Sequence, residues 1–159
     1  MELHEKPRVI VGVDGSLAGL RALRVAVREA RARGGALHAV RAWPYEPYDG
    51  FTGGLWAREV RRAAGEAIVD AFTQTLGGLP PDIPVSGFVI AGRPGDVLVG
   101  YADRDDDLLV VGRGRHLLRR SVSGQCARQA GCPVLVVPAD EFARTAARDL
   151  KRELAELVG

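Results

Sequence analysis

Cysteine and long apolar runs are scarce in this chain of 159 residues. Its two cysteines, Cys126 and Cys132, are too few for a disulfide framework, and we expect both to be reduced thiols. The first seven residues contain no apolar stretch of the kind that a secretory signal needs. No run approaches the roughly 18–20 apolar residues that cross a bilayer. The sequence therefore predicts a soluble, cytoplasmic protein.

An excess of charge of one sign is also missing. Twenty-two Lys and Arg residues face 20 Asp and Glu residues, which leaves a formal net charge of +2. This balance does not indicate a nucleic-acid partner, because such proteins gather their cations on one face. The hydrophobic share of 47% is ordinary for a globular protein, and the length suits one domain with its own core.

The motifs of common enzyme classes are absent. The chain has no Gly-x4-Gly-Lys-Ser/Thr phosphate loop and no Gly-x-Ser-x-Gly nucleophile elbow, and no Gly-x-Gly-x-x-Gly follows its first apolar run. The two cysteines have no Cys or His partners at zinc-site spacing. We therefore expect no catalytic residues, no metal site and no enzyme activity, with a weak ATPase-type activity as the alternative.

Two further features could suggest a site and are better explained structurally. His38 lies in an apolar run, where a half-buried structural histidine is the simpler interpretation. Asp103, Asp105, Asp106 and Asp107 directly precede another apolar run. We interpret them as a solvated turn at the edge of the sheet away from the predicted site.

Short apolar runs alternate with amphipathic segments along the chain, a pattern that predicts βαβ units and a mostly parallel sheet. The expected strands are 8–13, 36–43, 85–91, 107–111 and 133–138, and the expected helices are 17–33, 55–76, one that opens at Pro94, 121–130 and 140–158. The second helix is predicted to turn inward Trp56, Val60, Ala64, Ala67, Ala71 and Leu76.

Three polar clusters follow predicted strands. They are Asp14-Gly15-Ser16, Gly92-Arg93-Pro94 and Gly112-Arg113-Gly114. Because parallel strands end at one edge of their sheet, we expect the three clusters to lie along the same rim. Ligands bind at that rim in open α/β sheets, where the strand order reverses. The clusters therefore predict a binding site there.

The last segment forms a separate amphipathic helix. Its apolar stripe is Phe142, Ala146, Leu150, Leu154 and Leu157, set among charges. The helix either packs on its own domain or reaches a partner subunit. The expected organisation is an N-terminal tail at 1–7, an α/β domain at 8–138 and this helix at 139–159.

Three segments together resemble a known family. The segments 9–16, 108–112 and 132–138 are similar to the first, fourth and fifth strands of universal stress proteins, in order and with matching spacing. The resemblance implies an open, five-stranded parallel sheet with helices on both faces, which is a Rossmann-like α/β fold. It also implies homodimers joined through the last strand. The matching residues here are Val134, Leu135, Val136 and Val137. The C-terminal helix could join that interface or cover the strand edge instead.

The resemblance further implies a site for ATP or another adenine nucleotide, with Mg²⁺ accompanying it. Asp14 matches the family's acidic residue near the adenine, in the loop that holds Val13, Gly15 and Ser16. Val40 matches the second-strand contact to the base, and Gly92 a loop close to the ribose. The simpler alternatives are that Asp14 caps the following helix and that Val40 packs in the core.

The phosphate loop departs from the family pattern. After Gly112, the second glycine is replaced by Arg115, and Cys126 stands at the hydroxyl position. Counting back from Cys132 instead places Ser121 at the hydroxyl position and Arg120 at the last glycine, with the loop about five residues short.

A second alignment of this loop uses Gly114, Gly124 and Gln125. It leaves only six residues for the next helix, roughly 9 Å at 1.5 Å per residue, whereas a strand spans roughly 17–20 Å. We prefer the first alignment, which leaves ten helical residues.

Losing two or three phosphate contacts would cost roughly 3–9 kcal/mol, at about 1.5–3 kcal/mol for each hydrogen bond to a charged group. Nearby arginines could replace those contacts or form a solvated loop. The candidate nucleotide-binding residues of this loop are Gly112, Arg113, Gly114, Arg115, Arg120, Ser121 and Val122. Two functions remain open. One is a non-catalytic stress-response or regulatory protein that binds an adenine nucleotide. The other is a nucleotide-independent interaction module that needs no cofactor.

Overall fold

The computed structural model describes residues 5–43, 53–114, 121–139 and 141–158. The strands are β1 (Arg8–Gly12), β2 (Ala36–Trp43), β3 (Val85–Ala91), β4 (Leu108–Gly112) and β5 (Val134–Val137). The helices are α1 (Leu17–Arg33), α2 (Gly53–Leu76), α3 (Pro94–Tyr101), α4 (Val122–Gln129) and α5 (Glu141–Val158). Strands and helices alternate along the chain as expected.

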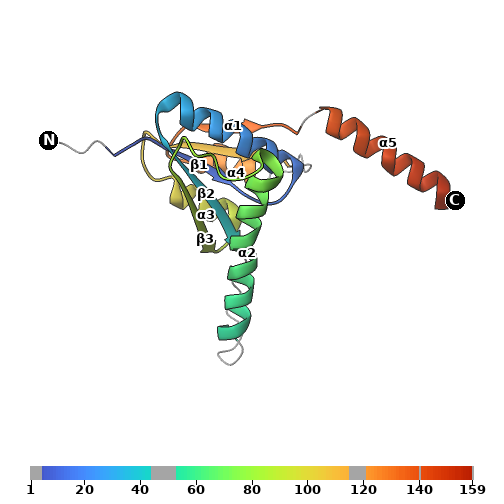
Figure 1. Ribbon diagram of the computed structural model, residues 1–159, viewed down its shortest axis with the longest axis horizontal. Coiled ribbons are helices and arrows are strands. Elements are labelled where there is room, and N and C mark those ends of the chain that lie inside the picture. The colour runs from blue at the N-terminus through green and yellow to red at the C-terminus, as the bar shows by residue number, and fades with distance from the viewer. Residues whose placement is uncertain (1–4, 44–52, 115–120, 140, 159) are drawn as a thin grey trace.

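All strand pairs are parallel, in the order β3-β2-β1-β4-β5. The predicted open α/β sheet with helices on both faces is therefore confirmed, together with the added helix α5 (Figure 1). Helices α1 and α2 pack on one face of the sheet, and α3 and α4 pack on the other. The strand order reverses between β1 and β4, so their carboxyl ends form the switch point at which such sheets bind ligands.

The central strands are buried on both faces. Val9, Ile10 and Val11 in β1 are fully inaccessible, as is Val110 in β4. This is why both strands are continuous apolar runs without alternation. Gly34 ends α1 in the left-handed conformation, with its N–H bonded to carbonyls of the last turn.

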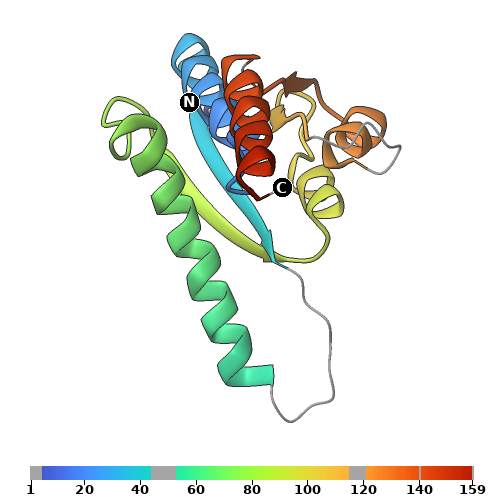
Figure 2. The same ribbon diagram turned by 90° about the vertical axis from the view of Figure 1, so that its right-hand side faces the viewer.

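The strands do not all end at the same level at the carboxyl edge of the sheet. Gly12, the last residue of β1, lies opposite Val40, and Val40 lies opposite Phe88. Strands β2 and β3 continue for three residues beyond that level, to Trp43 and Ala91. They form a wall that extends past the end of β1. Figure 2 shows these two long strands side by side.

The inward face of α2 differs from the prediction. Ala64 and Ala71 are buried as expected, whereas Trp56 is 54% exposed and Leu76 is also exposed. Phe72 fills the core instead. For Trp56 the reason is geometric, since the N-terminal half of α2 runs past the ends of the strands and has no sheet beneath it (Figures 1 and 2), and Leu76 is the last residue of the helix.

The interpretation of the Asp103–Asp107 segment as a solvated turn is wrong at its last residue. Asp107 is buried and accepts two hydrogen bonds from the Arg8 guanidinium, from Nε at 2.8 Å and from Nη2 at 2.6 Å. Arg8 also pairs with Asp103 at 2.8 Å. This cluster joins the start of β1 to the segment before β4, so it serves the fold.

Helix α5 extends away from the sheet (Figure 1). Leu150, Leu154 and Leu157 are 57%, 53% and 81% exposed, so this part of the stripe does not pack on its own domain. The side chains of Phe142 and Ala146 lie outside the described residues. No helix in the described part of the chain has the length and apolar character to cross a membrane.

Candidate functional site

The carboxyl ends of β1 and β4 meet closely at the switch point. A Cβ atom on Gly112 would lie 2.5 Å from the backbone carbon of Ala18 and 2.7 Å from the nitrogen of Gly19. Only glycine lets the end of β4 approach the first turn of α1 in this way. The end of β4 therefore lies against the first turn of α1, which directly follows the Asp14 loop.

The loop after β1 is held by its own side chains. Oδ1 of Asp14 accepts hydrogen bonds from the Ser16 N–H at 2.9 Å and from the Ser16 hydroxyl at 2.7 Å. The Ser16 oxygen in turn accepts from the N–H of Gly19 at 3.0 Å and caps α1. Ser16 is thus the helix cap, and Asp14 orients it. The side chain of Asp14 remains exposed at the rim of the sheet.

Gly19 is a site residue that the sequence interpretation missed. A Cβ atom there would overlap with Oδ1 of Asp14, so the glycine leaves room for that carboxylate beside the helix. The signal was available, because a glycine inside a helix costs stability and therefore has a packing or functional reason.

Strand β2 supports the same loop from the other side. The N–H of Val13 donates to the carbonyl of Val40 at 2.9 Å, and the side chain of Val40 is buried in the core. Arg41 donates from Nη1 to the carbonyl of Val13 at 3.2 Å. The structure thus gives Val40 a packing and supporting position. It also adds Arg41, which the sequence interpretation did not single out, as a cation bonded to the backbone of the residue before Asp14.

Gly92 lies at the same edge but two strands away from β1. Its N–H donates to the carbonyl of Trp43 at 2.9 Å, and its φ of 139° suits only glycine. A Cβ atom there would lie 3.0 Å from Val97 in α3. These contacts are with β2 and α3, so Gly92 shapes the wall formed by β2 and β3.

The segment after β4 first continues the pairing with β5. The N–H of Arg113 donates to the carbonyl of Val137 at 2.7 Å, and Arg113 and Gly114 are exposed. Arg115 and Arg120 lie outside the described residues, so their predicted phosphate contacts stay predictions.

Helix α4 decides between the two alignments of the phosphate loop. It begins at Val122, and the Ser121 oxygen caps it by accepting from the N–H of Gly124 at 3.0 Å. A helix that begins only at Gln125, as the second alignment required, is therefore wrong. The first alignment is consistent with this start, which places Ser121 at the N-terminus of a helix.

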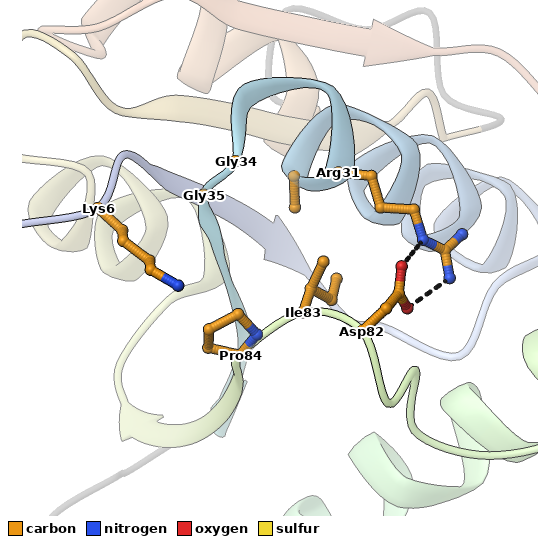
Figure 3. A pocket seen from close by; sticks show the side chains of 8 residues that line it. Lys6, Arg31, Gly34, Gly35, Asp82, Ile83 and Pro84 are labelled. Carbon is orange, nitrogen blue, oxygen red and sulfur yellow. Dashed lines mark hydrogen bonds and ion pairs between the residues drawn. The ribbon is translucent and has the colours of Figure 1, made fainter.

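A cavity of about 260 Å³ lies elsewhere, at the amino ends of β1, β2 and β3 (Figure 3). It is lined by Lys6, Ala30, Arg31, Gly34, Gly35, Asp82, Ile83 and Pro84. Arg31 and Asp82 form a two-point ion pair at its rim, with bonds of 2.5 and 2.9 Å. This cavity is at the opposite edge from the switch point and shares no residue with the predicted site.

The pKa values of His38 and Cys126 are shifted. Burial, and then the charge of Arg8, lower the pKa of His38. Its Nδ1 lies 2.6 Å from the Tyr101 hydroxyl, in a ring cluster with Phe88. His38 is half-buried, as expected. Burial raises the pKa of Cys126 to about 11, so this thiol stays protonated at neutral pH. Both cysteines are free thiols, as expected.

The chain is similar to known proteins over most of its length. The model of the family described as "Universal stress protein family" matches residues 7–138. A universal stress protein of Mycobacterium tuberculosis is 30% identical over 151 residues, which cover 86% of this chain and 50% of that protein. The chain thus spans about half the length of the curated relatives it matches.

Solved structures show the same fold. A universal stress protein crystallised in complex with cAMP is 30% identical, with a TM-score of 0.64 over 85% of this chain and 99% of that chain. A universal stress protein family protein from Arabidopsis thaliana, solved with AMP bound, is 21% identical, with a TM-score of 0.55 over 84% of this chain and 92% of that chain. At that lower identity, the likeness shows the fold alone.

Proposed function

The chain belongs to the universal stress protein family, and from this premise we propose that it binds an adenine nucleotide at the switch point between β1 and β4. The observation that carries the proposal is the approach of Gly112 to the first turn of α1, beside Asp14. This arrangement brings an exposed carboxylate and the start of the phosphate loop to one rim. The cAMP complex of the 30% identical relative supports the same ligand class.

The groups at this rim fit such a ligand. The Asp14 carboxylate can accept from the exocyclic amine of adenine, and Arg41 places a cation beside the loop. The N-terminus of α4, at Ser121 and Val122, offers backbone N–H groups of the kind that bind phosphate. The described residues include no cluster of three or more His, Cys, Asp or Glu side chains that could hold a metal ion. In this proposal, Mg²⁺ would therefore arrive with a nucleotide.

We further propose a regulatory role without catalysis, in the cytoplasm, with ATP as one candidate ligand. The arginine-bearing loop after Gly114 replaces the family's glycines, which predicts a weaker grip on a triphosphate than on the adenosine part. A homodimer through β5 is part of the same proposal, with α5 as a further part of the interface.

Isothermal titration with AMP, cAMP and ATP tests the proposed binding. We expect saturable binding, and we expect Asp14→Ala to weaken it by about tenfold or more, because it removes a hydrogen bond to a charged group. Asp14→Asn keeps an oxygen that can accept from Ser16 but loses the negative charge. Comparing the two variants therefore separates the effect of the turn from the effect of the ligand contact. Asp105→Ala, an exposed carboxylate outside the site, is the matched control.

The competing function is a nucleotide-independent interaction module. The exposed leucines of α5 favour it, because an apolar stripe in water indicates a partner. Absence of binding for all three nucleotides, in a chain shown to be folded, would favour this function and contradict the nucleotide site.

A further inference from the structure

The sheet has two outer edges, and they differ in what they offer to a partner. Among the described residues, strand β3 pairs only with β2, and β5 pairs only with β4. The outer backbone of each strand therefore carries N–H and C=O groups that no other strand in the described part of the chain uses. Such an edge is a template for pairing with another chain.

The direction of the backbone groups along β3 follows from its two ends. The carbonyl of Pro84 accepts from Leu37, and the N–H of Gly92 donates to Trp43. Both residues thus point toward β2. Because the strand alternates with period two, the even-numbered residues between them also point toward β2. The backbone groups of Val85, Gly87, Val89 and Ala91 therefore point outward.

These four residues are self-complementary under a twofold axis. If two copies of β3 pair antiparallel about Phe88, Val85 faces Ala91 of the other copy, and Gly87 faces Val89. Each pair is then of the hydrogen-bonded type and exchanges two bonds. The twofold axis repeats both pairs, which gives four pairs. At two bonds each they make eight bonds, so every outward N–H and C=O group of these residues has a partner.

The side chains of β3 present no obstacle to this pairing. The strand, Val-Ser-Gly-Phe-Val-Ile-Ala, contains no charge and no proline, so no like charges meet across the axis. Ser86, Gly87 and Ala91 are exposed, so the described part of the chain leaves these positions of β3 accessible. The two Phe88 rings would lie opposite each other as a non-hydrogen-bonded pair, in which cross-strand aromatic side chains contact.

The β5 edge offers much less. By the same alternation, the carbonyls of Pro133 and Val137 point toward β4, which leaves Val134 and Val136 outward. Twofold pairing would give two pairs at two bonds each, four bonds in all. The next outward carbonyl, on Pro138, is already bound by Arg21 at 2.7 Å.

We propose that the β3 edge is an interaction surface for a second copy of this chain, which pairs antiparallel with it about Phe88. This interface is separate from the β5 edge and does not depend on nucleotide binding. The two edges lie at opposite sides of the sheet, so a chain that uses both assembles beyond a dimer.

Two variants test the interface in the full-length chain. Ser86→Lys places a charge on an exposed edge position, and Ala91→Pro removes an outward N–H at the last residue of the strand. Gln74→Lys, an exposed position on α2, is the matched control. Val136→Lys tests the β5 edge. Circular dichroism shows that each variant is folded.

Sedimentation equilibrium over about a hundredfold range of concentration gives the first measurement. We expect the native mass to rise past that of a dimer. Ser86→Lys and Ala91→Pro should each raise the dissociation constant of the β3 contact by about tenfold or more. Gln74→Lys should change nothing. The double variant Ser86→Lys/Val136→Lys should be a monomer.

Amide hydrogen exchange gives a position-specific measurement. Protection of Val85, Gly87 and Val89 should rise with protein concentration, whereas Ser86, Phe88 and Ile90 should be protected throughout by β2. A chain that stays monomeric at every concentration overturns the proposal. So does a chain in which Val136→Lys alone abolishes association. Fast exchange of the outward amides in the associated state also overturns it.

Discussion

Single glycines set how closely the segments at the carboxyl edge approach one another. Gly112 lets the end of β4 touch the backbone at Ala18, and Gly19 leaves room for the Asp14 carboxylate. A methyl group at either position would push these segments apart and widen the proposed site. By contrast, a Cβ atom on Gly114 would meet no described residue within 4 Å.

His38 gives a prediction about pH. Burial and the positive charge of Arg8 lower its pKa in the folded state below the value of about 6.5 found in unfolded chains. Protonation therefore favours the unfolded state. We expect the free energy of unfolding to be constant with respect to this group above pH 6.5. It should fall as the pH drops below 6.5 toward the folded-state pKa.

Urea unfolding from pH 8 to pH 5 measures this effect, with His38→Gln as the comparison. The difference in the free energy of unfolding between the two chains should shrink as the pH falls. Only the unsubstituted chain carries His38, whose protonation favours the unfolded state. A difference that stays constant over the whole range would contradict the lowered pKa. Tyr101 is the near neighbour that the ring of His38 contacts.

At the scale of elements, ion pairs join segments that are distant in sequence. The Arg8–Asp107 pair ties the start of β1 to the start of β4 and is shielded from water, whereas the Arg31–Asp82 pair is exposed. Removing one partner of a buried pair leaves an uncompensated charge, whereas exposed pairs contribute little.

This contrast predicts different outcomes for two matched substitutions. Asp107→Asn should lower the free energy of unfolding by about 1.5–3 kcal/mol, because Arg8 loses its buried counter-charge and keeps only the exposed Asp103. Asp82→Asn should leave the free energy of unfolding almost unchanged. Chemical denaturation of both variants at pH 7 provides the measurement. Equal effects of the two substitutions would show that burial of Asp107 does not govern its contribution.

At the scale of the whole molecule, α5 stands apart from the α/β domain. The exposed Leu150, Leu154 and Leu157 contribute no burial to the fold of a single chain. Truncation after Ala147 should therefore leave the urea midpoint of the monomeric double variant Ser86→Lys/Val136→Lys unchanged. It should also reduce binding of a hydrophobic dye. A drop in the midpoint would show that α5 packs on its own domain.

The layered fold was readable from local pattern. Buried β-branched runs alternate with amphipathic segments, and this pattern suffices for a parallel sheet because crossover helices must cover both faces. The rim was predictable for the same reason. Asp14 and Gly112 both follow a strand, and parallel strands end on one side.

Tertiary contacts decided the rest. Asp107 is the buried member of an acidic run because Arg8, 99 residues away, reaches it, and no local pattern marks that partner. Arg41 meets the carbonyl of Val13 because β2 happens to run beside β1 in this register. Trp56 is exposed because α2 outruns the strands it covers. Each of these outcomes depends on distances between segments remote in sequence. The tendency of a segment to form a strand or a helix, and the capping of a helix, depend on neighbours along the chain.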